Sequence, residues 1–387
     1  MGEWKSCTLS SLGTIVGGAT PSTKKPENYE GGTIPWITPK DLSGFSGRYI
    51  SHGERNITEK GLNSCSAQMM PKHSVLFSSR APIGYVAISD CEVCTNQGFK
   101  SIVPNENTDY LFLYYLLQYK KKDIENLGSG TTFKEVSANT MKNVEVRVPA
   151  KKNEQIRIAR VLSAIDDKIE ANTRINENLQ QQAQALFTQC YEQADVSVPF
   201  TDLIQVLGGG TPKTGEASYW NGEIPFFTPK DVGTPYTLTT EKTITKSGLE
   251  HCNSRLYPVN TVFVTARGTV GKVGLAGGPM AMNQSCYALT GKSISPLLTY
   301  HYTLMTVAHL KHKASGAVFD AIITRDFETE TVKKLSDTLA EQFVAVASPI
   351  YECILNNTLE SQRLADLRNA LLPKLMSGEL DASDIEL

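Results

Sequence analysis

The chain has 387 residues, of which 40% are hydrophobic and 20% charged, and its 38 basic and 40 acidic side chains give a net charge of -2. This length allows two domains of ordinary size, and the charge excludes nucleic-acid binding by bulk electrostatics alone, so any basic surface must be local or supplied by a partner. The sequence has no run of about 18–20 apolar residues and no signal-peptide core at its start, so we expect no membrane association and a cytoplasmic location.

Residues 1–150 form the first predicted domain. Short apolar runs are separated here by Gly, Pro, Asn and Ser, and runs such as 74–77, 85–88 and 144–148 are rich in branched or alternating residues. These features predict strands. One helix interrupts them, over residues 109–121, where Leu111, Tyr114 and Tyr115 follow a helical spacing.

Residues 151–192 form one predicted long helix. The segment lacks Gly and Pro, and its apolar residues are spaced alternately by four and three at Ile158, Leu162, Ile165, Ile169, Leu179, Ala183 and Leu186. Asn172 and Asn176 occupy the two missing positions of this heptad pattern. The pattern predicts a helix with an apolar a/d stripe that must pack against a partner.

Residues 193–337 repeat the first domain. The segments 17–21 (GGATP) and 34–41 (IPWITPKD) return as 208–212 (GGGTP) and 224–231 (IPFFTPKD), and a second helix is predicted near residues 297–313. The two copies are about 190 residues apart, which is far longer than the repeat of a solenoid. The repeat therefore indicates a duplicated domain.

Residues 338–387 contain a second heptad stripe, in which Asn357 takes the place that Asn172 has in the first. The nearest available partner for each stripe is the other. Asn172 and Asn357, at matching positions of the two seams, are predicted to fix the register of the two helices at some cost in stability. We expect Pro349 to kink or restart the second helix. The alternative is two unrelated core helices that both carry Asn.

The order domain, long helix, domain, long helix, together with the Gly-Gly-x-Thr-Pro and Thr-Pro-Lys-Asp blocks, resembles the specificity subunit of type I restriction-modification systems over essentially the whole chain. The resemblance implies an α+β fold with two duplicated β-rich target recognition domains. It also implies that the two long helices form an antiparallel coiled coil in a pseudo-twofold arrangement, as a spacer between the domains.

The resemblance further implies recognition of a bipartite, asymmetric site in double-stranded DNA. Two methyltransferase (modification) subunits would methylate adenine at N6 with S-adenosylmethionine, and motor-nuclease (restriction) subunits would cut DNA with ATP and Mg2+. This chain would then hold no cofactor of its own.

Residues shared by both copies are candidates for framework or phosphate contact, because two different half-sites need different base-reading side chains. Arg80 and Arg267, each at the end of an apolar strand, are the strongest basic candidates. Other shared pairs have two interpretations each. The threonines contact phosphate or form tight turns, the lysines face phosphate or are held by the following Asp, and the amides contact adenine or are structural: Thr20, Thr211, Lys40, Lys230, Asn96, Gln97, Asn283 and Gln284.

Residues that differ between the copies are candidates for specificity. In the first domain these are Lys24, Lys25, Tyr29, Arg48, Tyr49 and Arg55. In the second domain they are Lys213, Tyr219, Trp220, Tyr236 and Lys242.

Motifs for catalysis are missing. The sequence has no Walker A loop, no acidic-Pro-Pro-aromatic block of adenine methyltransferases and no nuclease cluster, and neither Cys91 with Cys94 nor His309 with His312 has the partners of a metal site. We therefore expect no catalytic residues and no metal. The alternatives are a coiled-coil interaction scaffold without DNA specificity, an enzyme such as a nuclease, and the specificity subunit of a methylation-only system.

Overall fold

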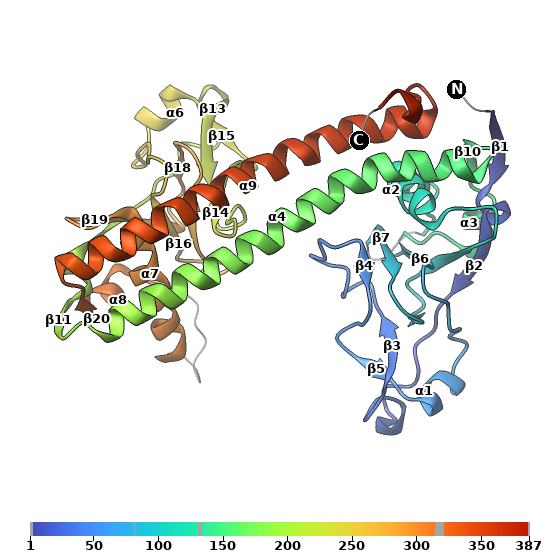
Figure 1. Cartoon of the computed structure of the whole chain (residues 1–387), viewed down its shortest axis with the longest axis horizontal. Helices are drawn as coiled ribbons and strands as arrows, with labels where there is room; N and C mark the ends of the chain where they lie inside the picture. Colours follow the sequence, from blue (N-terminus) through green and yellow to red (C-terminus); the bar gives the residue numbers. More distant parts are fainter. Residues whose placement is uncertain (1–2, 81, 131–133, 314–320, 386–387) are drawn as a thin grey trace. The chain divides into compact units, whose positions relative to one another are not determined.

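The computed structural model describes residues 3–80, 82–130, 134–313 and 321–385. The chain divides into two compact units, residues 1–170 with 363–387, and residues 171–362. Each unit holds one β-rich domain and parts of two long helices, α4 (Lys152–Glu192) and α9 (Asp337–Ser377), drawn green and red in Figure 1. The predicted α+β fold with duplicated β-rich domains and two long helices is confirmed.

The first β-rich domain contains a five-stranded sheet in the order β2-β9-β6-β7-β4, a three-stranded sheet β5-β3-β8 and the pair β1-β10. The predicted helix at 109–121 is confirmed and extends further, to Asn126. The elements are β1 (Trp4–Thr8), β2 (Gly13–Gly17), β3 (Ile34–Ile37), β4 (Tyr49–Ile50), β5 (Asn56–Ile57), α1 (Glu59–Asn63), β6 (Val75–Ser79), β7 (Ile83–Ser89), β8 (Cys94–Thr95), β9 (Lys100–Pro104), α2 (Tyr110–Asn126), α3 (Ala138–Lys142) and β10 (Glu145–Pro149).

The second β-rich domain repeats these sheets strand for strand, as β12-β19-β16-β17-β14, β15-β13-β18 and β11-β20. Its elements are β11 (Val196–Pro199), α5 (Phe200–Leu203), β12 (Ile204–Gly208), β13 (Trp220–Phe227), β14 (Tyr236–Thr237), β15 (Thr243–Ile244), α6 (Lys246–Glu250), β16 (Val262–Thr265), β17 (Val273–Ala276), β18 (Ala281–Met282), β19 (Cys286–Gly291), α7 (Pro296–Lys313), α8 (Thr324–Glu328) and β20 (Thr331–Lys334). The shared strand order shows that the sequence repeat is a structural one.

A repeated Ile-Thr…Gly-Leu pattern starts the short helices α1 and α6. The hydroxyls of Thr58 and Thr245 accept hydrogen bonds from the amides of Gly61 and Gly248, both at 3.0 Å, and so cap the two helices. A Cβ on either glycine would lie 2.4 Å from the carbonyl oxygen of Asn28 or Tyr219, each the last residue of a 3-10 helix. Glycine is therefore required where α1 and α6 touch these turns.

Each unit has a core in which the long helices pack against the helix of the β-rich domain. In the first unit, Phe112 of α2 belongs to the same buried cluster as Leu162 of α4 and Leu375 of α9. In the second unit, Phe187 of α4 and Phe343 of α9 share a buried cluster with α7. Burial of the predicted stripes thus attaches each β-rich domain to both long helices. No helix among the described residues is long and apolar enough to span a membrane.

The helices α4 and α9 run antiparallel within the second unit. Asn172 Nδ2 lies 3.2 Å from Ser361 Oγ, while Asn176, one turn further along α4, lies 3.4 Å from the carbonyl oxygen of Ile354. The expected restart at Pro349 is wrong, because α9 continues through this residue. Pro349 and Ala345 are both exposed, so water can reach the Ala345 carbonyl that loses its helical donor.

Candidate nucleic-acid interface

Two loops meet in the same way in both β-rich domains. One is the glycine-rich loop after β2 or β12, and the other is the Asn-Gln loop that follows β8 or β18. A Cβ on Gly18 would lie 2.1 Å from the carbonyl oxygen of Thr95, and one on Gly209 would lie 2.1 Å from that of Asn283. The glycines are required by this close backbone approach.

The threonine of each glycine-rich loop holds the glutamine of the other loop. The Thr20 hydroxyl donates to Gln97 Oε1, and the Thr211 hydroxyl donates to Gln284 Oε1. All four residues are surface groups, Thr211 being the least exposed. With its oxygen used in this way, each glutamine offers the Nε2 donors to a ligand, such as a phosphate oxygen or a base acceptor.

The asparagine side chains serve the same loops. Asn96 Oδ1 accepts from the amide of Gly98 at 2.8 Å, and Asn283 Oδ1 accepts from the amide of Ser285 at 3.0 Å. These bonds favour the structural interpretation of the amide pair. A bidentate contact of an asparagine with adenine needs its Oδ1 as acceptor, and here Oδ1 already accepts a backbone amide. Such a contact stays a prediction.

The Thr-Pro-Lys-Asp blocks are turns closed by aspartate. Asp41 Oδ2 accepts from both the amide and the hydroxyl of Thr38 at 2.7 Å, and its Oδ1 accepts from the amide of Glu54 at 2.7 Å. Asp231 makes the matching contacts with Thr228 and Glu241 at 2.6–2.8 Å. The aspartates were not among the predicted site residues, although their recurrence in both blocks was the available signal.

The lysines of these turns pair with glutamates. Lys40 Nζ lies 2.6 Å from Glu54 Oε2, and Lys230 Nζ lies 3.9 Å from Glu241 Oε2. The hydrogen bond with Glu54 raises the pKa of Lys40. Both lysines are more than three-quarters exposed, so these ion pairs are weak and a phosphate can compete for the ammonium groups.

A groove of about 410 Å³ in the second domain gathers several predicted residues. Its lining includes Lys230, Lys242, Arg267 and Asn283. The strand end before Arg267 is bound to the Asn-Gln loop, because the amide of Ala266 donates to the carbonyl of Ser285 at 2.8 Å. Three cations from three segments thus line one groove.

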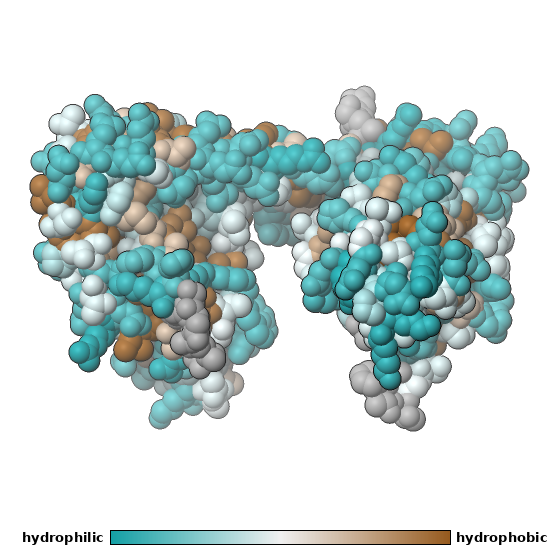
Figure 2. Space-filling view, turned by 90° about the horizontal axis from the view of Figure 1, so that it is seen from below, coloured by the Kyte–Doolittle hydropathy of each residue, from teal (hydrophilic) through white to brown (hydrophobic). Residues whose placement is uncertain are grey.

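The first domain has the same framework. The amide of Ser79 donates to the carbonyl of Gly98 at 2.7 Å, which places Arg80 beside the Asn-Gln loop. A Cβ on Gly98 would lie 2.8 Å from Pro39, so the Thr-Pro-Lys-Asp turn also touches this loop. Figure 2 shows the end of this domain that carries α1, β3 and β5, and the surface there is mainly hydrophilic.

A cation lies over an aromatic ring at matching places of the two domains. The Arg55 guanidinium lies 4.3 Å from the Tyr29 ring centroid, and the Lys242 ammonium lies 5.7 Å from that of Trp220. The rings also fix their own loops, since Tyr29 donates to the carbonyl of Pro21 and Trp220 to that of Lys213. The neighbouring predicted lysines are exposed, namely Lys24, Lys25 and Lys213.

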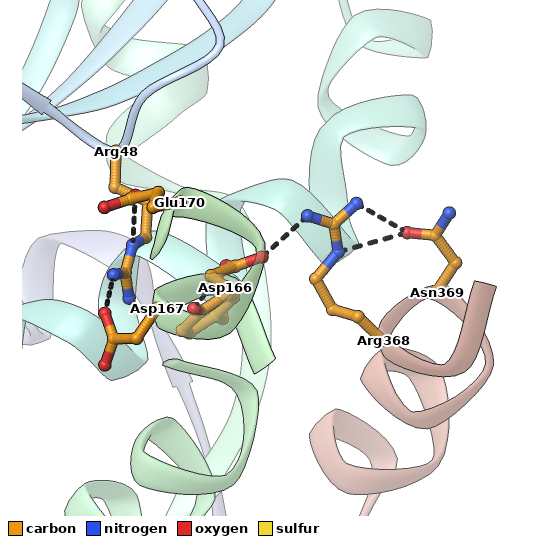
Figure 3. Close-up of polar contacts among 7 residues, drawn as sticks. Arg48, Asp166, Asp167, Glu170, Arg368 and Asn369 are labelled. Carbon is orange, nitrogen blue, oxygen red and sulfur yellow. Dashed lines mark hydrogen bonds and ion pairs between the residues drawn. The ribbon is translucent and has the colours of Figure 1, made fainter. Parts of the chain in front are cut away.

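Two of the predicted specificity residues are buried, so that prediction is wrong for them. Arg48 forms ion pairs with Asp167 and with Glu170 of α4, the second at 3.3 Å (Figure 3). Tyr236 is 3% exposed and donates to Asn260 Oδ1 at 2.7 Å. Comparison of the copies detects that these residues differ, but it does not detect that they face the interior.

In the described part of the chain, no three His, Cys, Asp or Glu side chains lie close enough together to hold a metal ion. The Cys94 thiol donates to the carbonyl of Pro35 at 3.5 Å, and His309 Nδ1 lies 2.6 Å from Glu330 Oε2. These residues therefore have partners within the fold.

Comparison with known proteins agrees with the duplicated architecture. A model of the type I restriction modification DNA specificity domain matches residues 1–181 and 196–333. The type I restriction enzyme MjaIX specificity subunit of Methanocaldococcus jannaschii is 30% identical over 411 residues, which cover 99% of this chain and 95% of the relative. The chain belongs to the family of type I restriction-modification specificity subunits.

Other relatives match less of the chain or only its fold. The EcoR124I/EcoR124II specificity subunit of Escherichia coli is 31% identical over 170 residues, covering 42% of this chain and 41% of the relative. The crystal structure of the S subunit from M. genitalium aligns over 97% of this chain and 96% of that one, with a TM-score of 0.59 and 16% identity. The predicted function as a DNA-specificity subunit is confirmed, and the two β-rich domains are its recognition domains.

Proposed function

We propose that this specificity subunit binds one bipartite, asymmetric sequence in double-stranded DNA, with each recognition domain contacting one half. The chain itself has no catalytic groups in this proposal. It directs two methyltransferase subunits, which methylate adenine at N6 with S-adenosylmethionine, and motor-nuclease subunits, which restrict unmethylated DNA with ATP and Mg2+. The cytoplasmic location expected from the sequence is part of the proposal, because the substrate is chromosomal DNA.

The observation that carries the proposal is a shared framework with different side chains. Both domains have the Thr-Gln contact and the turn closed by aspartate. On this framework, Arg55 over Tyr29 in one domain corresponds to Lys242 over Trp220 in the other. A common framework suits the phosphate backbone, which is the same at both half-sites, and different side chains suit different bases.

The long helices have a role in the proposal as a spacer of fixed length. Each recognition domain packs on both α4 and α9, so a change in the helices is transmitted to both domains. Linked domains gain affinity through effective concentration only when both half-sites lie at the separation the linker permits. Each of the two compact units contains one recognition domain and parts of both long helices, so the chain offers two similar docking surfaces for methyltransferase subunits.

The test is a genome-wide map of N6-methyladenine in cells with and without this chain, with the native methyltransferase subunit present in both. Loss of methylation at a single split, asymmetric motif on removal of the chain supports the proposal and gives the target. Unchanged methylation, with the chain expressed and the methyltransferase active, overturns it in favour of an interaction scaffold. Methylation without cleavage of unmodified DNA indicates a methylation-only system.

A further inference from the structure

In the first recognition domain, one carboxylate lies between Arg80, a predicted interface residue, and Lys100 at the start of β9. Glu135 Oε2 lies 3.7 Å from an Arg80 guanidinium nitrogen, and Glu135 Oε1 lies 3.3 Å from Lys100 Nζ. Arg80 and Glu135 are 34% and 40% exposed, whereas Lys100 is 13% exposed. The carboxylate therefore reduces the positive charge of this surface at the place where the strongest basic candidate lies.

The second recognition domain has the same backbone arrangement without the carboxylate. Residues 80 and 135 form a backbone bridge, and residues 267 and 321 form the corresponding one. The amides of Val136 and Ile322 donate to the carbonyls of Ser79 and Ala266, at 2.9 and 3.0 Å, so Glu135 corresponds to Ala321.

The second cation of the group, Lys100, also has no basic counterpart in the second domain. The register of β2 with β9 places Lys100 opposite Gly17, and the register of β12 with β19 places Tyr287 opposite Gly208. Arg267 is exposed, and no carboxylate in the described ranges lies within ion-pair distance of it. Among the described residues, the second domain therefore has an arginine without a counter-charge where the first domain has an Arg-Glu-Lys group.

We propose that Glu135 is a counter-charge that competes with DNA phosphate for Arg80 and Lys100, and so lowers the affinity of the first recognition domain for DNA of the wrong sequence. The inference rests on the proposed function, because it assumes that this surface meets DNA. An ion pair between partly exposed groups is weak, so a phosphate held in place by correct base contacts displaces the carboxylate. Without those contacts the glutamate repels the backbone, which increases discrimination between sequences. At Arg267, no described residue supplies such a competitor.

The carboxylate is separable from the fold. The backbone of Glu135 makes two hydrogen bonds with Ser129, at 2.9 and 3.0 Å, and these do not involve its side chain. Ala321 shows that an equivalent backbone bridge forms without a carboxylate. Glu135→Ala is therefore expected to fold, and the reciprocal Ala321→Glu places a counter-charge beside Arg267.

The experiment measures binding of a mixed-sequence DNA duplex to the full chain assembled with its methyltransferase subunit, by fluorescence anisotropy over a range of salt concentrations. Glu135→Ala is expected to bind about fivefold more tightly and with a steeper salt dependence, because two cations become available to phosphates. Ala321→Glu is expected to bind about fivefold more weakly. Glu145→Ala is the matched control, since it removes an exposed carboxylate from β10 in the same unit.

The background variant Arg80→Ala/Lys100→Ala decides whether the gain acts through these cations. Loss of the Glu135→Ala gain in this background supports the inference. Wild-type affinity for Glu135→Ala, or a gain that persists in this background, overturns it. Arg267→Ala separates the two proposals, because weaker binding by this variant keeps the DNA interface even where the Glu135 inference fails. Equal binding by Arg267→Ala and wild type overturns the placement of the interface, and the inference with it.

Discussion

Asn357 of α9 donates a hydrogen bond from Nδ2 to Oδ1 of Asn176 of α4, at 2.9 Å, in the seam of the two long helices. One turn away, Asn172 is fully buried and its Nδ2 lies 2.8 Å from Glu360 Oε2. Asn172 Oδ1 is buried, and no hydrogen-bond partner for it lies in the described part of the chain. The amides thus replace apolar packing at the middle of the stripe, which costs stability and defines one register.

Replacement of one seam amide is expected to destabilise the chain more than replacement of both. Asn357→Leu leaves the buried Asn176 Oδ1 without its donor, so we expect a loss of about 1–3 kcal/mol in unfolding free energy. Asn176→Leu/Asn357→Leu removes both polar groups and is expected to be at least as stable as wild type, with a less uniquely defined register. Urea unfolding measures both, with Asn178→Leu on the exposed face of α4 as control. Equal loss in the single and double variants would contradict the pairing.

The buried histidine of α7 is expected to make stability depend on pH. His301 lies 3.0 Å from both Gln184 Oε1 of α4 and the Tyr351 hydroxyl of α9, and burial lowers its pKa from 6.5 to about 3. Between these values the unfolded chain binds a proton that the folded chain does not, so stability falls as the pH drops below 6.5. This group contributes about 1.4 kcal/mol per pH unit in that window.

His301→Gln is therefore expected to flatten the pH dependence of the urea midpoint between about pH 7 and pH 5. The exposed His52→Gln is the control, because its ring is not held between two helices. If the urea midpoint of His301→Gln depends on pH as steeply as that of wild type, other groups cause the pH dependence.

Loss of Arg48 is expected to weaken the first unit without a direct effect on DNA contact. The Arg48 side chain is 6% exposed, while that of Asp167 is 65% exposed, so only the arginine of this pair is buried. Arg48→Ala removes this cation from two carboxylates, and we expect a loss of about 2–3 kcal/mol. Arg48→Lys is expected to recover part of it, because lysine keeps the charge but not the guanidinium fork. Thermal unfolding measures the loss, and DNA affinity below the melting transition is expected to stay near wild type.

The sequence pattern was sufficient to predict what depends on local periodicity. The heptad spacing predicted a helix over residues 151–192, and α4 spans Lys152–Glu192. Internal duplication predicted the two domains because the same short blocks return in the same order. These features are regular along the chain, so no knowledge of distant contacts was needed.

Contacts between distant segments were not predictable in this way. Glu54 and Glu135 supply the counter-charges of Lys40 and Arg80 from other loops, at sequence separations that follow no motif. Arg48 differs from its counterpart and is basic, as a specificity residue should be, yet it pairs with α4. Burial of a charged side chain depends on its partner, and only the folded chain shows which partner that is.

The last prediction concerns the length of the spacer. Insertion of seven residues into both α4 and α9, between the two compact units, keeps the phase of the apolar seam and lengthens each helix by about 10 Å. If the helices set the separation of the half-sites, the methylated motif is expected to keep both halves and gain about three base pairs between them, at roughly 3.4 Å each. N6-methyladenine mapping reads the motif directly. Insertion into α4 alone is the control, since it shifts the seam residues past their partners and is expected to abolish methylation. An unchanged spacing in the double insertion would show that the long helices do not measure the distance between half-sites.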